Sequence, residues 1–183
     1  MLTETLQELD IAFRQLEFAV RLLSYCELGH IKPSDFDADH LTQLPNGSLH
    51  FPSGSFSDKD SICRAANINF IMAFGTSVLV LDQAFQAFGI RPDAEATDNI
   101  GRLRTLVYMV RCAHAHRIAD PRWEVRGKYR RTLIVALPGE TISLDLEALD
   151  GAGFDIDSIG GYVGWYEMHR IAKERFAEHF TRS

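Results

Sequence analysis

Apolar residues recur at alternating steps of three and four along the start of the chain. The positions are Leu2, Leu6, Leu9, Phe13, Leu16, Val20 and Leu23. This spacing lines one helix face and predicts a helix over residues 3–28. Gly29 is a suitable C-cap residue, and Pro33 prevents the helix from continuing. A stripe this regular packs inside a bundle or against a second copy of the helix, and we expect the bundle.

Two further helices are predicted before the pattern changes. Residues 59–88 follow an N-cap signal at Ser57 and Asp58, and the second half of this segment is apolar on all sides, as in a central buried helix. A third helix is expected over residues 99–113. Its core positions are Ile100, Leu103, Leu106, Val107 and Val110. Asp120 and Pro121 end this helical stretch.

Residues 131–137 and 141–146 are rich in β-branched and aliphatic residues and are joined by Pro138, Gly139 and Glu140, which predicts a β-hairpin. Residues 123–125 can add a short strand, and we expect Trp123 to anchor the 123–146 appendage on the bundle. A last helix begins at Ser158 or Gly161 and ends near residue 180. The predicted fold is mainly α: a four-to-five-helix bundle with a small antiparallel β-hairpin between the third and last long helices.

Residues 30–57 interrupt the helical pattern. The segment is rich in Pro, Gly, Ser, Asn and Asp and contains the turn signals PNGS at 45–48 and PSGS at 52–55. We interpret it as a long loop insert with room for a short hairpin, within a single helical domain of residues 1–183. Long loops of this kind are often functional.

Composition narrows the class of protein. The net charge of −6 argues against binding of duplex DNA through the overall charge of the protein. A local basic site remains compatible with this net charge. Three cysteines without metal-ligand spacing suggest reduced thiols. The first residues lack the pattern of a secretory signal, and the apolar stretch 70–81 is short and interrupted. We therefore expect a cytoplasmic protein without a membrane partner.

The candidate chemistry lies in residues 106–117, LVYMVRCAHAHR. Arg111 and His116 stand in the spacing R-x4-H at the end of the third predicted helix. Arginine carries a permanent charge whose planar fork fits phosphate, and histidine moves protons near neutral pH.

An all-helical domain with R-x4-H near a helix end resembles the HEPN superfamily, which includes many uncharacterised bacterial members. The resemblance covers the helices before residue 101 and the motif helix 101–117. It implies a metal-independent endoribonuclease that acts in the cleft of a homodimer, in phage defence or stress. It also implies that Arg111 is the motif arginine and His116 the motif histidine. The family often has a polar residue after the arginine, and Cys112 stands here instead.

The expected reaction is cleavage of single-stranded RNA by its own 2′-OH. His116 would act as acid or base and Arg111 would stabilise the charge on phosphorus. No cofactor and no metal are expected. The residues expected to contact RNA nearby are His114, Arg117, Arg122, Lys128 and Tyr129.

Several alternatives remain open at this stage. Arg111 can cap the carbonyls of its own helix. The basic run at residues 126–131 can be a solvated edge that discourages strand pairing. Cys112, His114 and His116 share a face for a metal only if the chain is extended there. The whole domain can also be a non-catalytic HEPN-like module that binds a nucleotide, RNA or a partner protein.

Overall fold

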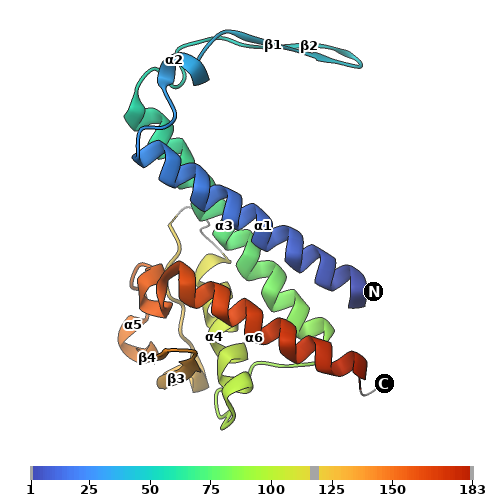
Figure 1. Ribbon diagram of the computed structural model, residues 1–183. Coiled ribbons are helices and arrows are strands. Elements are labelled where there is room, and N and C mark those ends of the chain that lie inside the picture. Colours follow the sequence, from blue (N-terminus) through green and yellow to red (C-terminus); the bar gives the residue numbers. More distant parts are fainter. Residues whose placement is uncertain (1, 116–119, 182–183) are drawn as a thin grey trace. The chain divides into compact units, whose positions relative to one another are not determined.

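The computed structural model describes residues 2–115 and 120–181, with side chains through Glu178 (Figure 1). The chain divides into two compact units, residues 1–13 with 75–183 and residues 14–74. Helices α1 (Leu2–Glu27) and α3 (Lys59–Ala87) each run from one unit into the other. The described chain is mainly helical, which confirms the predicted fold class.

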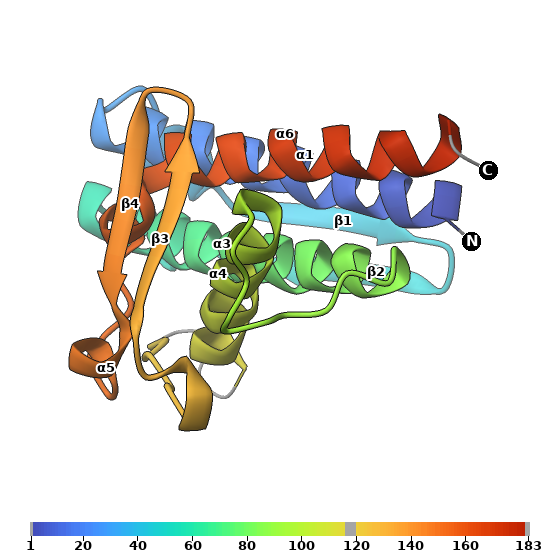
Figure 2. The same ribbon diagram turned by 90° about the horizontal axis from the view of Figure 1, so that it is seen from below.

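The first unit is built on the start of α1, the end of α3, α4 (Asn99–His114) and α6 (Gly161–Thr181). Figure 2 shows α1 and α6 lying side by side. Phe13 on α1 stacks on Trp165 of α6 with ring centroids 6.2 Å apart. Phe176, further along α6, packs edge-on against Phe85 of α3 at 5.0 Å. These aromatic contacts join helices that are distant in sequence into one core.

A small antiparallel hairpin completes this unit. Strands β3 (Thr132–Leu137) and β4 (Glu140–Asp145) pair in register, and their inward side chains are buried, as the alternating pattern predicts. Asn99 at the start of α4 fixes the hairpin: its side chain donates to the Ala136 carbonyl and accepts from the Ala136 amide, both at 2.9 Å. Short elements flank it, namely η1 (Gly127–Tyr129), α5 (Leu146–Leu149) and η2 (Ile156–Ile159).

The additional strand considered at residues 123–125 does not form. The structure has a single bridge between Arg122 and Gly153 there. Trp123 is 1% exposed and packs against the Phe154 ring at 5.3 Å. Trp123 is thus buried within the appendage, and its role as an anchor on the bundle stays a prediction.

The second unit contains the end of α1, the start of α3 and the segment between them. Cys26, Ile62 and Ala66 form its small core. The segment predicted as a loop insert holds a helical turn, α2 (Pro33–Phe36), and a hairpin of β1 (His40–Leu44) and β2 (Gly47–Phe51). A hairpin within this insert was anticipated, but its strands have no apolar alternation strong enough to set their limits from sequence.

The four long helices lie close to their predicted ranges, and each end differs from the prediction by no more than a few residues. By length and composition α3 is apolar enough to cross a membrane, with half of its most apolar window buried in the protein. A core helix of a soluble protein meets the same criterion.

Candidate functional site

Helix α4 carries the motif arginine on an otherwise buried element. Asp98 caps the helix by accepting a hydrogen bond from the Gly101 amide at 3.3 Å. Most side chains from Leu103 onward are buried, so the helix is embedded in its unit. Arg111 lies in the last turn and is partly exposed. Among the described residues, none forms a hydrogen bond or ion pair with the Arg111 guanidinium, but its place in the last turn is where a cation interacts favourably with the helix dipole.

The partly exposed face of α4 next to Arg111 is polar and aromatic. A hydrogen bond with the Cys112 thiol raises the pKa of Tyr108, which Arg111 opposes through its charge. The Tyr108 ring lies 5.4 Å from the ring of Tyr129. Lys128 places its ammonium 5.8 Å from the Tyr129 ring centroid and 3.9 Å from an Asp93 carboxylate oxygen. The structure thus packs Tyr129 against Tyr108, which lies one turn before Arg111 on α4, with Lys128 beside the Tyr129 ring.

His114 is placed differently from the sequence expectation of a substrate contact. It is 3% exposed, its Nδ1 lies 2.9 Å from the Val110 carbonyl oxygen, and its ring meets Phe154 edge-on at 4.8 Å. Burial lowers the pKa of His114 and favours the neutral imidazole. These contacts give His114 a packing role beneath the site rather than a position on its surface.

His116 and Arg117 lie outside the described residues. Of the expected arginine–histidine pair, the structure therefore locates only Arg111. Cys112 and His114 both belong to α4, and one is partly exposed whereas the other is buried. Within residues 2–115 and 120–178, no group of three or more His, Cys, Asp or Glu side chains could hold a metal ion.

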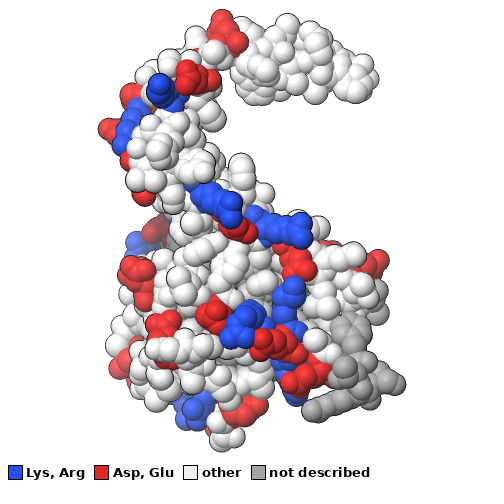
Figure 3. Space-filling view, in the orientation of Figure 1, with Lys and Arg blue, Asp and Glu red and all other residues white. Residues whose placement is uncertain are grey.

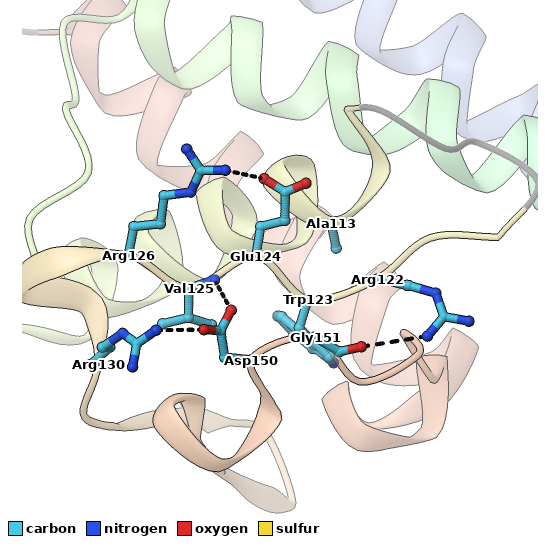
Figure 4. Close-up of a pocket in the computed structure, with 9 residues that line it drawn as sticks. All are labelled: Ala113, Arg122, Trp123, Glu124, Val125, Arg126, Arg130, Asp150 and Gly151. Carbon is cyan, nitrogen blue, oxygen red and sulfur yellow. Dashed lines mark hydrogen bonds and ion pairs between the residues drawn. The ribbon is translucent and has the colours of Figure 1, made fainter.

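A pocket of about 490 Å³ opens at the end of α4 (Figure 4). It is lined by Ala113, Arg122, Trp123, Glu124, Val125, Arg126, Arg130, Asp150 and Gly151. Ala113 belongs to the last turn of α4, so the pocket begins where this helix ends, and Arg111 is not among its lining residues. Backbone hydrogen bonds hold its walls together: the Arg122 amide donates to the Ala113 carbonyl at 3.2 Å, and the Gly151 amide donates to the Trp123 carbonyl at 2.8 Å.

Three arginines and two carboxylates line this pocket, with Arg126 and Arg130 on one side and Arg122 on the other in Figure 4, and Arg122 pairs with Asp120 at 3.2 Å. Arg130 forms a 2.6 Å ion pair with Asp150, whose other oxygen accepts from the Val125 amide at 2.9 Å. This pairing holds the wall in place and neutralises one charge.

Two donors at the pocket are only weakly engaged within the fold. The Arg126 Nη2 lies 3.4 Å from Oε2 of Glu124, which is a long ion pair, and the Arg126 side chain is 86% exposed. The buried Nε1 of Trp123 has no hydrogen-bond acceptor among the described residues. The guanidinium groups of this pocket are the kind of donors that suit an anion or the acceptor edge of a base.

The buried ion pair of Arg104 and Asp82 was not anticipated from sequence. Arg104 and Asp82 both lie in apolar helical segments. A charged residue on a core face needs a partner, so its presence in such a segment is the sequence signal for a buried ion pair. Asp150 and Trp123 were also not anticipated as pocket residues, because the loop after α5 meets residues 122–130 only in the folded chain.

No family model, no curated protein and no solved structure matches this chain.

Proposed function

We propose that this protein is a metal-independent endoribonuclease of the HEPN type. The observation that carries the proposal is that two features lie at the end of one helix: Arg111, partly exposed in the last turn of α4, and the arginine-lined pocket, which Ala113 of the same turn helps to line. Single-stranded RNA suits such a surface because arginines bind its phosphates and aromatic rings stack on its bases.

In the proposed reaction the 2′-OH of one ribose attacks the adjacent phosphorus. His116 takes the hydroxyl proton as general base, and Arg111 neutralises the charge that develops on the phosphoryl oxygens. The P–O5′ bond breaks, and the 5′-oxygen leaves with a proton from a second histidine. The products are a 2′,3′-cyclic phosphate and a free 5′-OH. A second copy of the chain would supply that second histidine, which is why the proposal includes a homodimer.

A non-catalytic binding module is the second candidate function, and Cys112 favours it. The family's usual polar residue is replaced here by a thiol, which lies one turn after Tyr108 on the same helix. The pocket would then bind RNA or a nucleotide without cleaving it.

The deciding experiment incubates the protein with single-stranded RNA in excess chelator and analyses the product ends. Cyclic phosphate ends that disappear in Arg111→Ala and His116→Ala support the nuclease. Binding without cleavage supports the module. Cleavage that requires magnesium, or that also cuts the DNA version of the strand, contradicts the mechanism because DNA has no 2′-OH.

A further inference from the structure

A second pocket, which we call the β3 pocket, lies near the start of α4, at the other end of the helix from Arg111. It has a volume of about 200 Å³ and is lined by residues 94–97, Arg102 and residues 131–134, all in the first unit. Pockets for drug-sized ligands measure roughly 300–1,000 Å³, so this one suits a small molecule or one group of it. It shares no lining residue with the pocket at Ala113.

Two arginines line the β3 pocket without a carboxylate partner. Nε of Arg102 donates to the Ala96 carbonyl at 3.2 Å, and Nη1 of Arg131 donates to the Ala94 carbonyl at 2.8 Å. Neither guanidinium forms an ion pair or a further hydrogen bond with the residues that the structure describes. Arg102 is half-buried and Arg131 is exposed. Each side chain is therefore fixed by one donor and keeps its other donors and its charge for a ligand.

The edge of β3 at this pocket adds a main-chain donor. The Asn99 side chain binds both the amide and the carbonyl of Ala136, so the backbone of Ala136 faces away from β4. Backbone groups of an antiparallel strand alternate between its two edges, so the Ile134 amide faces the same way. Figure 2 shows β3 between β4 and α4, and Ile134 lines the pocket. In the described part of the chain, no residue outside the hairpin accepts from this amide.

The charges around the pocket favour an anion. Among the described residues that line it, Glu95 alone carries a carboxylate, against the two arginines. On the face of the molecule shown in Figure 3, Lys and Arg are interspersed with Asp and Glu. A pair of arginines without a carboxylate partner is thus a local feature rather than part of a broad basic surface of the kind that tracks a nucleic-acid backbone.

We propose that the β3 pocket binds a phosphate group, either as free phosphate or at the end of a small phosphomonoester. Arg102 and Arg131 would hold the phosphate oxygens, and the Ile134 amide would donate to one of them. A phosphate group carries close to two negative charges at neutral pH and so matches two arginines, whereas a carboxylate matches one. The bound group would join the 94–97 segment, the start of α4 and β3. Binding here is independent of RNA cleavage and is measured without RNA.

The first experiment titrates isotope-labelled protein with inorganic phosphate and, separately, with glycerol 3-phosphate, and follows the backbone amides by nuclear magnetic resonance. The signals of Thr132 and Ile134 should shift and saturate. Arg102→Gln and Arg131→Gln should each weaken binding about tenfold or more, because each loses charge-assisted hydrogen bonds. Glu95→Gln should strengthen binding, because it removes the opposing charge. Tighter binding of glycerol 3-phosphate assigns the pocket to a phosphomonoester, and tighter binding of inorganic phosphate assigns it to the free ion.

The matched control is Arg91→Gln. Arg91 is exposed, lies three residues before Ala94 and lines no part of the pocket, so its loss should leave phosphate binding unchanged. Circular dichroism checks the fold of every variant, because both lining arginines also bond to the backbone. Glu95→Gln changes an exposed side chain and keeps the test decisive if an arginine variant fails to fold. Saturation without shifts at residues 132 and 134, an equal loss in Arg91→Gln, or no gain in Glu95→Gln overturns the proposal.

Single-stranded RNA separates this pocket from the proposed nuclease site. Arg102→Gln and Arg131→Gln should weaken phosphate binding and leave RNA binding and cleavage as in the wild type. A parallel loss of RNA affinity in both variants, with displacement of phosphate by RNA, overturns a separate small-ligand site and makes the β3 pocket part of the RNA surface. A protein that binds phosphate at the β3 pocket but neither binds nor cleaves RNA supports the pocket and contradicts the proposed function.

Discussion

Arg104 and Asp82 form an ion pair in the core of the protein, with Nη1 and Oδ1 2.7 Å apart and both side chains at most 4% exposed. The Arg104 Nε donates to the Ile90 carbonyl at 3.0 Å, and its guanidinium lies 5.4 Å from the Phe85 ring centroid. This pair ties α4, which carries Arg111, to α3. The partly exposed Arg111 of the candidate site is therefore on a helix held in place by a buried arginine two turns earlier.

Removal of one partner of this pair should destabilise the protein strongly. Asp82→Ala leaves the Arg104 charge buried without a counter-ion, and we expect a loss of about 3–5 kcal/mol in the free energy of unfolding. Urea unfolding followed by circular dichroism measures the loss. Arg170→Ala, which removes an exposed helix-surface pair with Glu167, should cost no more than about 1 kcal/mol. Similar losses in the two variants would contradict the buried role of the pair.

Substitution of His114 should lower stability, whereas substitution of His116 should remove RNA cleavage. His114→Ala empties a buried site and removes the contact with the Val110 carbonyl, so we expect a loss of about 2 kcal/mol in unfolding free energy. His116→Ala should instead abolish RNA cleavage with little change in stability, and Arg111→Ala should lower the cleavage rate by about 100-fold or more. The measurements are urea unfolding and RNA cleavage on the same samples. Full activity in His116→Ala would move the proton-transfer role elsewhere.

The pocket should contribute to RNA affinity through its exposed arginine. Arg126→Ala should weaken binding of single-stranded RNA and lower the slope of log affinity against log salt by about 0.7, the value for one released counter-ion. Fluorescence anisotropy at several salt concentrations measures both quantities. Arg175→Ala provides the control, because that arginine on α6 pairs with Glu178 and lines no part of the pocket. An unchanged slope in Arg126→Ala would place the phosphates elsewhere.

Stability should fall between pH 7 and pH 5 because of His169. Burial first, and then the charge of Lys173, lower its pKa to about 4, against a partial opposing effect of Asp10. The unfolded chain, with an ordinary histidine pKa near 6.5, binds more protons in this window than the folded chain does. The stabilisation is therefore complete above about pH 6.5 and is lost as the pH falls toward 4. We expect about 1–2 kcal/mol of the loss by pH 5, after allowance for partial exposure.

The matched variant for this pH effect is His169→Gln. It retains a polar side chain near the Phe13 ring, on which His169 stacks at 3.7 Å, but it cannot titrate. Urea unfolding at pH 7 and pH 5 should show a smaller difference in His169→Gln than in the wild type. An equal difference would assign the pH dependence to other groups, such as His114, whose pKa is also lowered by burial.

Much of the fold follows from local patterns in the sequence. The step of three and four from Leu2 to Leu23 produces α1, because a helix turns every 3.6 residues and one apolar stripe must be buried. The alternation of apolar and polar residues on both sides of Pro138 and Gly139 produces β3 and β4, because successive side chains of a strand point to opposite faces and one face is buried. The sequence also placed Arg111 near a helix end, because Asp120 and Pro121 set a limit to the helix, and α4 ends at His114, before that limit.

Only the tertiary structure decided which side chains share a site. The sequence spacing treats His114 as a neighbour of Arg111, but the direction of each side chain on α4 buries His114 against Phe154 and leaves Arg111 exposed. Asp150 reaches Arg130 across twenty residues, and Asp82 reaches Arg104 across twenty-two. Such pairings depend on how separate elements pack, which no local periodicity encodes. The pocket exists because residues 122–130 and the loop after α5 pack beside the end of α4. That packing is decided by the folded core.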